Sequence, residues 1–330
     1  MNRQNENTEI KLVTWNEEAR QSESKKRRLR EARRRRRRRR QLVLTLRFLA
    51  AALVLVLLVG FVSGRGIFEG RGMRFFAGRE STEAASYAKA DEADLAVPTL
   101  YEGNAIREKL RGLADSDKAY EEIYENYDAY PEALMAALCS SSELLPYVQG
   151  YLTSDGQAHG AVTDKELAEA VPLFLQWDSR WGYASYGDSS IALSGCAPTC
   201  LSMVIVGLTG NAGATPAAVA EYAQSEGYYL EGTGTSWAIM TEGCQHFGVV
   251  GTELALDESV IRRHLQNGEP IICSMRPGDF TTGGHFIVLT EIREDGIVVH
   301  DPNSEKRSGV LWSYDTLAGQ IKNLWGFTRK

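Results

Sequence analysis

The 330-residue sequence has only five cysteines and five histidines, and their spacing excludes several kinds of site. Cys196 and Cys200 lie four residues apart on one predicted helix face, which is poor geometry for a disulfide. No further ligands follow at the spacing of a zinc site. There is no dinucleotide-binding fingerprint, and no lysine follows the short glycine cluster GTGTS at 232–236, which argues against a phosphate loop. The sequence therefore predicts no metal and no cofactor.

Acidic residues are scarce in residues 1–47, which hold 17 Lys and Arg against 6 Asp and Glu, whereas the remaining residues hold 20 basic and 37 acidic side chains. Eight consecutive arginines precede an apolar stretch, 41–63, that is broken only by Thr45 and Arg47. This stretch is long enough to span a bilayer, and Arg47 can snorkel to the interface. Since positive charge stays cytoplasmic, we expect a single-pass membrane protein with a cytoplasmic N-terminus and an extracytoplasmic C-terminal domain.

Two alternative interpretations of the N-terminal segment are weaker. A cleavable signal peptide needs a small-residue cleavage site, but SGRGIFEG follows Val62 and the basic segment before the apolar run is very long. An uncleaved anchor is therefore favoured, with the arginine-rich tail also contacting anionic membrane lipid. Nucleic-acid binding by the tail is the minor option, because the tail has the charge but no base-reading module.

Composition and helix signals divide the chain into six segments. In order these are a basic cytoplasmic tail (1–40), a transmembrane helix (41–63), a juxtamembrane stalk (64–103), a helical spacer (104–152), a linker (153–171) and the main globular domain (172–330). The spacer holds four short helical patterns, which begin at Asn104, at Asp115 or Ser116, at Pro131 and at Ser141 or Ser142.

The main domain is predicted to have helices first and strands afterwards, which describes an α+β fold with an antiparallel sheet. The predicted helices cover 197–208, 216–226, 237–247 and 258–267, followed by a helical turn at 317–321. The predicted strands cover 269–275, 285–293, 296–301 and 323–328.

Cys196 is the candidate nucleophile because it lies where a glycine-containing loop meets a predicted helix. Unpaired backbone N–H groups and the positive end of the helix dipole favour a thiolate there, and the thiolate is the reactive form. An odd number of cysteines also leaves at least one thiol free. The alternative is that Cys196 is a small buried residue, as Cys139, Cys244 and Cys273 are expected to be.

His285 is the best candidate base, since it follows TTGG and opens an apolar strand at an edge that a substrate can reach. Asp301 ends the next strand and is the candidate that orients the imidazole. A tight hairpin at Asp295–Gly296 would instead place His285 opposite Lys306, so the pair meets only if a bulge or strong twist intervenes. A backbone carbonyl or Asn303 is the rival orienting group.

Gln176 completes the set, because a Gln amide can donate to an oxyanion together with the backbone N–H of Cys196. The motifs around these residues are QWDSRWG, YGDSSIALSGCAPTCLSMV, GYYLEGTGTSW, PIICSMRPGDFTTGGHFIVL, VVHDPNS and IKNLWGF. Over about 172–330 they resemble papain-like cysteine peptidases, specifically the bacteriocin-processing, double-glycine-leader family (family thirty-nine of cysteine peptidases).

That resemblance implies a papain-like fold with Cys196 as nucleophile, His285 as base, Asp301 as its orienter and Gln176 as oxyanion donor. It implies a peptide or protein substrate, and the predicted topology makes cell-wall peptide equally plausible. The sequence departs from the family at Ala197, where glycine is usual, and at Arg276, where a small residue is common.

Two other functions fit the same fold. One is a non-catalytic, membrane-tethered module that binds wall or protein ligands, and the other is an acyltransferase or transpeptidase. Five tryptophans in the domain could line a binding groove, although a role in the core is favoured. They are Trp177, Trp181, Trp237, Trp312 and Trp325.

Overall fold

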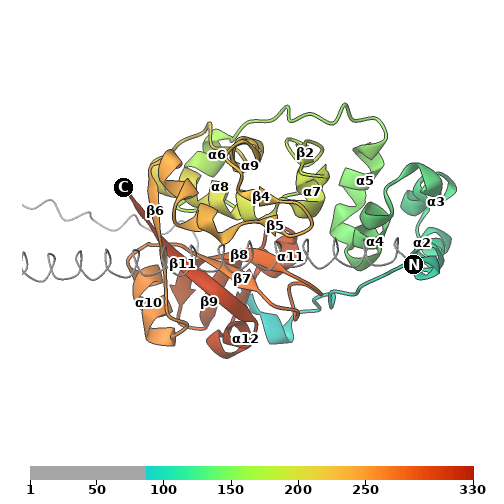
Figure 1. Ribbon diagram of the computed structural model, residues 1–330. Coiled ribbons are helices and arrows are strands. Elements are labelled where there is room, and N and C mark those ends of the chain that lie inside the picture. The colour runs from blue at the N-terminus through green and yellow to red at the C-terminus, as the bar shows by residue number, and fades with distance from the viewer. Residues whose placement is uncertain (1–86) are drawn as a thin grey trace, which may run out of the picture. The chain divides into compact units, whose positions relative to one another are not determined.

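The computed structural model describes residues 87–330, so the predicted tail and transmembrane helix (1–40 and 41–63) lie outside the described residues (Figure 1). Between residues 87 and 330, no helix combines the length and the apolar character that a membrane span needs. The described residues, 87–330, belong to one compact unit.

A seven-stranded sheet forms the centre of the domain, and every neighbouring pair is antiparallel except β1 with β10. In sheet order the strands are β1 (Ala88–Lys89), β10 (Val310–Trp312), β9 (Gly296–His300), β8 (His285–Arg293), β7 (Ile271–Met275), β11 (Ile321–Arg329) and β6 (Val249–Glu253). The α+β class and the predicted strands of 269–301 and 323–328 are confirmed. β6 and β10 were not predicted.

Helices cover both faces of this sheet, so its central strands are buried on both sides (Figure 1). Along β8, Phe286 and Val288 belong to the core beneath α8 (Cys196–Thr209), whereas Ile287 and Leu289 belong to the core beside α10 (Glu258–Gln266). This alternation follows from the two-residue period of a strand. It explains why β7 and β8 are nearly continuous apolar runs.

Local signals set most helices of the domain. α8 ends at Gly210, which has a φ of 71° that favours glycine. Thr215 caps α9 (Pro216–Ser225) and Asp257 caps α10, as predicted. The short helices are α6 (Asp164–Leu167), α7 (Ile191–Ser194), α11 (Glu305–Ser308) and α12 (Tyr314–Ala318), and two small hairpins pair β2 (Ser185–Tyr186) with β3 (Ser189–Ser190) and β4 (Tyr229–Leu230) with β5 (Gly234–Thr235).

The single helix predicted over 237–247 is wrong. The segment forms two 3-10 turns, η5 (Trp237–Met240) and η6 (Gly243–Phe247). Gly243 lies at the break, and a Cβ there would come within 2.9 Å of both Ile239 and Tyr228. Gly243 is a weak helix former whose backbone is closely packed, so the segment does not form one continuous helix. The turn predicted at 317–321 is likewise displaced, because Ser313 caps α12 earlier in the chain.

The spacer region is helical, with α2 (Asn104–Ser116), α3 (Glu121–Glu125), α4 (Glu132–Ser140) and α5 (Leu145–Tyr151) joined by 3-10 turns. Asp117, rather than Asp115 or Ser116, caps the second segment by accepting from the Ala119 N–H. The core of these helices includes Ala192 and contacts Leu193, both from α7. The spacer thus packs directly against the segment that leads into α8.

Candidate active site

Cys196 is the first residue of α8, and it lines a cleft of about 880 Å³ together with His285. The first N–H groups of a helix have no partner inside the helix. Unpaired N–H groups therefore lie at the end of α8 that carries the Cys196 thiol. Helix α8 itself is fixed by a buried run that begins at Ala197. The methyl group of Ala197 fits this core, where its side chain is 1% exposed.

His285 and Asp301 form a buried pair. The Nε2 atom of His285 lies 2.7 Å from Oδ1 of Asp301, and Asp301 is fully buried. Cys196 is near enough to His285 to help raise the pKa of its imidazole. Because Asp301 occupies Nε2, Nδ1 is the ring nitrogen left for the thiol. The His285–Asp301 pair and the Cys196 thiol therefore lie beside one another at the cleft.

The strand register that permits this pair differs from the one predicted. The β8–β9 hairpin turns at Glu294 and Asp295, because Arg293 pairs with Gly296. A bulge at Thr290 then shifts the pairing by one more residue, so that Val288 faces His300. The expected bulge is present, and with the earlier turn it removes the predicted pairing of His285 with Lys306.

The segment after β9 holds Asp301 rigidly. The Asn303 N–H donates to Oδ1 of Asp301 at 2.8 Å, and the Asp301 N–H donates to Oγ of Ser308 at 2.9 Å. The Arg307 guanidinium lies 3.8 Å from Oδ2 of the same carboxylate. Asn303 contacts Asp301 through its backbone N–H. The side chain that bonds to the imidazole is therefore that of Asp301 and not that of Asn303.

The electrostatics of the pair favour a protonated imidazole. Burial alone lowers the pKa of His285, but the neighbouring Asp301 carboxylate and Cys196 outweigh burial and raise the pKa above its usual value. Burial instead lowers the pKa of His300 to about 4, and the ring stays neutral. Of these two histidines in adjacent strands, only His285 can hold a proton at neutral pH.

Gln176 is buried and lies beside the segment that leads into α8. Its Nε2 donates to the Ala192 carbonyl at 2.6 Å, and its backbone N–H donates to the Pro302 carbonyl at 2.7 Å. Gln176 therefore connects α7, through its side chain, with the Asp301 segment, through its backbone. It does not line the cleft as the structure stands. One N–H of its amide has no partner among the described residues and is the group that could reach an oxyanion.

The other cysteines have the buried, unreactive character expected of them. Cys139, Cys200, Cys244 and Cys273 are buried and free, and burial raises the pKa of each thiol. Cys196 alone among the five is partly exposed. Within residues 87–330 there is no group of three or more His, Cys, Asp or Glu side chains that could hold a metal.

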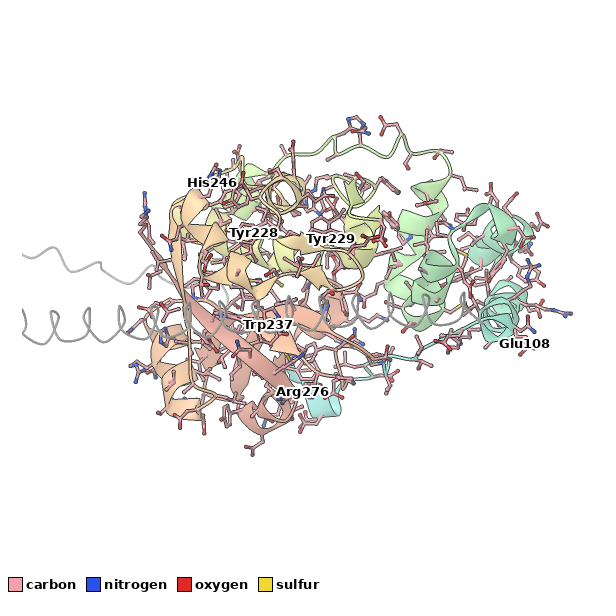
Figure 2. The ribbon with its side chains drawn as sticks, in the orientation of Figure 1. Glu108, Tyr228, Tyr229, Trp237, His246 and Arg276 are labelled. Atoms are coloured by element: carbon pink, nitrogen blue, oxygen red, sulfur yellow. The ribbon has the colours of Figure 1, made fainter. Side chains whose placement is uncertain are left out.

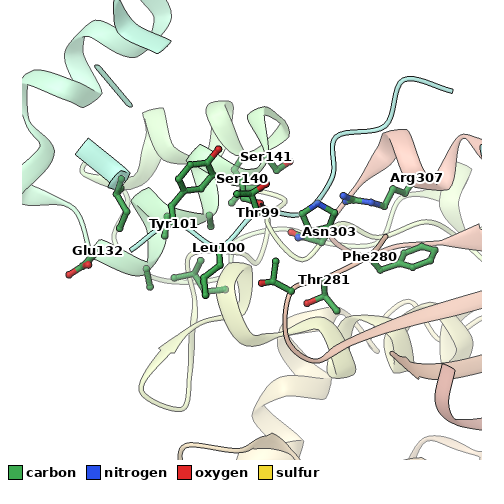
Figure 3. A pocket seen from close by; sticks show the side chains of 18 residues that line it. Thr99, Leu100, Tyr101, Glu132, Ser140, Ser141, Phe280, Thr281, Asn303 and Arg307 are labelled. Carbon is green, nitrogen blue, oxygen red and sulfur yellow. Dashed lines mark hydrogen bonds between the residues drawn. The ribbon is translucent and has the colours of Figure 1, made fainter. Parts of the chain in front are cut away.

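A second pocket, of about 560 Å³, lies between the spacer and the domain (Figure 3). Asn303, Phe280 and Thr281 line it from the domain, and Leu100 and Glu132 line it from the spacer side. Leu193 lines both pockets. Leu193 of α7 thus lies between the cleft and the second pocket.

Among the tryptophans named as groove candidates, Trp237 lines the cleft, and two further contributors, Lys322 and Glu143, were not predicted. Trp237 is 39% exposed. Trp181, Trp312 and Trp325 are core residues, which is the role that the sequence favoured. Lys322 lines the cleft from β11. Glu143, from the spacer, accepts from Oγ of Ser304 at 2.6 Å. Glu143 and Ser304 are 161 residues apart, and no local signal in the sequence connects them.

One known family matches part of the chain. Residues 168–330 match the sequence model of the Peptidase_C39 like family. This part of the chain is a Peptidase_C39-like domain. No curated protein and no solved structure matches the chain. The domain includes Gln176, Cys196, His285 and Asp301, and it excludes the spacer helices α2–α5.

Proposed function

We propose that the chain is a thiol hydrolase, a cysteine peptidase that cleaves peptide amide bonds. The observation that carries this proposal is the buried His285–Asp301 pair, with His285 and Cys196 lining the same open cleft. Membership of 168–330 in the Peptidase_C39 like family points the same way. A free, partly exposed thiol beside a charged imidazole is the arrangement that nucleophilic catalysis requires.

In the proposed reaction, His285 already holds the proton of Cys196 as an imidazolium, and the thiolate sulfur attacks the carbonyl carbon of the substrate amide. The backbone N–H of Cys196 and Nε2 of Gln176 stabilise the oxyanion. The imidazolium then protonates the departing amine as the C–N bond breaks, leaving a thioester. His285 next removes a proton from water, which attacks the thioester and releases the acid and the free thiol. Asp301 keeps the imidazole oriented throughout.

The test is a peptide-library digestion with the full-length chain, read by mass spectrometry, beside the Cys196→Ala variant. We expect cleavage that depends on Cys196. Labelling with a thiol probe at neutral pH should modify Cys196 before the four buried cysteines. A chain that cleaves nothing and labels no faster at Cys196 than at Cys244 would be a binding module on this fold. Products joined to an added amine would instead identify a transpeptidase.

We further propose that this domain is anchored in the cell membrane by 41–63 and lies outside the cytoplasm. The support is the arginine block immediately before the apolar stretch. A reporter enzyme that works only outside the cytoplasm, fused after Lys330, should be active. Activity of a cytoplasm-only reporter at the same position would reverse the orientation.

A further inference from the structure

The cleft around Cys196 is cationic, although the chain beyond residue 47 is acidic. Among the described residues that line the cleft there are two cations, Arg276 and Lys322, and no Asp or Glu. Residues 48–330 as a whole hold 37 acidic residues against 20 basic ones. A cleft that lacks carboxylates in such a chain concentrates positive potential where a substrate binds.

Arg276 is held close to the reacting groups. It follows Met275, which pairs with His285 across β7 and β8. Its backbone N–H donates to the Gln320 carbonyl at 2.7 Å, and its Nη1 donates to the Ile321 carbonyl at 2.8 Å. One edge of the guanidinium is therefore tied to β11. The remaining N–H groups stay available to a ligand (Figure 2 shows Arg276 on the face that also carries Trp237).

Lys322 is directed by an irregularity of the sheet. The β7–β11 register shifts between Ile321 and Asn323, so Lys322 is the extra residue of a bulge. Bulges redirect side chains that would otherwise alternate across a sheet. The ammonium group lies 5.3 Å from the ring centroid of Trp237, which also lines the cleft. Ring and cation thus hold each other at the cleft wall.

Neither cation is neutralised by the chain itself. Within residues 87–330, neither Arg276 nor Lys322 forms an ion pair. Both are exposed. An exposed guanidinium with a fixed edge is suited to bind a carboxylate through paired hydrogen bonds.

We infer that the cleft selects acidic peptides, in which a carboxylate near the scissile amide binds Arg276 and Lys322. This inference rests on the proposed peptidase activity and names its substrate class. The carboxylate has two sources, an Asp or Glu side chain or a free C-terminus. An uncharged amide of the same shape would leave both cations unpaired and would bind less well.

The test uses the full-length chain and a random peptide library, with cleavage sites read by mass spectrometry. Asp and Glu should be enriched over Asn and Gln at one position beside the cleaved bond. Peptides with a free C-terminal carboxylate are compared with the same peptides carrying a C-terminal amide. This comparison distinguishes binding of the C-terminal carboxylate from binding of an Asp or Glu side chain. For a matched pair of peptides with Glu or Gln at that position, kcat/KM should favour Glu by about tenfold or more.

Arg276→Gln and Lys322→Gln should each move that ratio towards one, and high salt should do the same. The ratio compares two peptides on the same enzyme, so partial misfolding cancels. Arg329→Gln removes an exposed cation from the same strand as Lys322 but away from the cleft, and it should keep the ratio. Two results would overturn the inference and leave the peptidase proposal intact. One is cysteine-dependent cleavage without a preference for acidic peptides, and the other is a preference that persists when Arg276→Gln and Lys322→Gln are combined.

If the wild-type chain cleaves nothing, the peptidase proposal fails and binding decides the inference. Fluorescently labelled peptide pools that differ only in Glu or Gln would be titrated into the Cys196→Ala chain. Tighter binding of the Glu pool, lost in Arg276→Gln, supports the cationic subsite. Equal binding or no binding rejects it.

Discussion

In the helical wall of the cleft, the position of Cys196 depends on one helix, whereas in the sheet wall His285 and Asp301 depend on contacts between several distant segments. Helix α8 carries the thiol at its first residue. The imidazole and carboxylate lie on β8 and just after β9, and the register of a bulged hairpin brings them together. The proposed nucleophile is thus positioned by one helix, while the proposed base depends on the pairing of neighbouring strands.

The two walls also differ in exposure. The thiol of Cys196 is partly exposed, and Asp301 is fully buried behind His285. Changes to the helical wall should therefore alter chemistry with little effect on stability, whereas changes to the sheet wall should alter both. Each of the following predictions tests this difference, beginning with the largest expected effect.

Cys196→Ala should abolish turnover, because no other group can form the thioester. Its thermal unfolding should remain close to that of the wild type, since the side chain is small and partly exposed. Rates on a cleaved peptide and a melting curve measure the two effects. Cys244→Ala is the matched control: it removes a buried thiol that bonds to the Met240 carbonyl, so it should keep turnover while lowering stability. Turnover that survives in Cys196→Ala would place the site elsewhere.

Asp301→Asn should lower kcat by about 10⁴-fold, because a neutral amide no longer steadies the imidazolium. Asp301→Ala should also lower the free energy of unfolding by about 3–5 kcal/mol, since it leaves His285 and the Asn303 N–H without their buried partner. Kinetics and chemical denaturation give the two values.

Asn303→Ala is the counterpart that separates the two orienting groups. Only the backbone of Asn303 contacts Asp301, so this variant should keep its activity. The exposed Asp295→Asn, in the hairpin turn, should change neither activity nor stability. Loss of activity in Asn303→Ala together with normal activity in Asp301→Asn would show that the orienting group has been assigned to the wrong residue.

Much of this candidate site can be predicted from the sequence because its signals are local. A thiol at a loop–helix junction marks Cys196, and a strand that opens at His285 and another that ends at Asp301 follow from apolar runs. The strand register could not be determined from the sequence, because it depends on a turn at Glu294 and Asp295 together with a bulge at Thr290. The contact of Glu143 with Ser304 and the position of Lys322 over Trp237 depend in the same way on segments far apart in sequence.

Gln176→Ala should lower kcat by about 10²–10³-fold, because it removes one proposed oxyanion donor. It also removes the hydrogen bond from Nε2 to the Ala192 carbonyl, so a loss of about 1 kcal/mol in stability should accompany it. Kinetics at saturating substrate give the first effect. Gln149→Ala removes a comparable bond to a backbone carbonyl in the spacer and should leave kcat unchanged. A kcat for Gln176→Ala within twofold of the wild type would leave the oxyanion to backbone groups alone.

Glu143→Gln should have a smaller effect that connects the spacer to the sheet wall. The carboxylate of Glu143 accepts from Oγ of Ser304 and from the Glu305 N–H at 2.7 Å, and so caps α11 beside the Asp301 segment. Losing its charge at a helix N-terminus should cost about 1 kcal/mol of stability and less than tenfold in kcat. Glu132→Gln, on the same spacer but remote from α11, is the control. A kcat as low as that of Asp301→Asn would mean that the spacer takes a direct part in the site.

The last prediction concerns the pH dependence of stability, which has opposite signs at His285 and His300. The folded pKa of His285 is raised above its unfolded value of about 6.5, so its contribution to stability is full below that pH and is lost as the pH rises through the folded value. The folded pKa of His300 is lowered to about 4, so burial of its neutral ring destabilises the fold as the pH falls from about 6.5 towards 4. Chemical denaturation should be measured from about pH 4 to about pH 10. We expect His300→Asn to reduce the loss of stability at acid pH and His285→Asn to reduce the loss at alkaline pH. If both variants shift the same limb of the curve, the two rings are not held in opposite charge states.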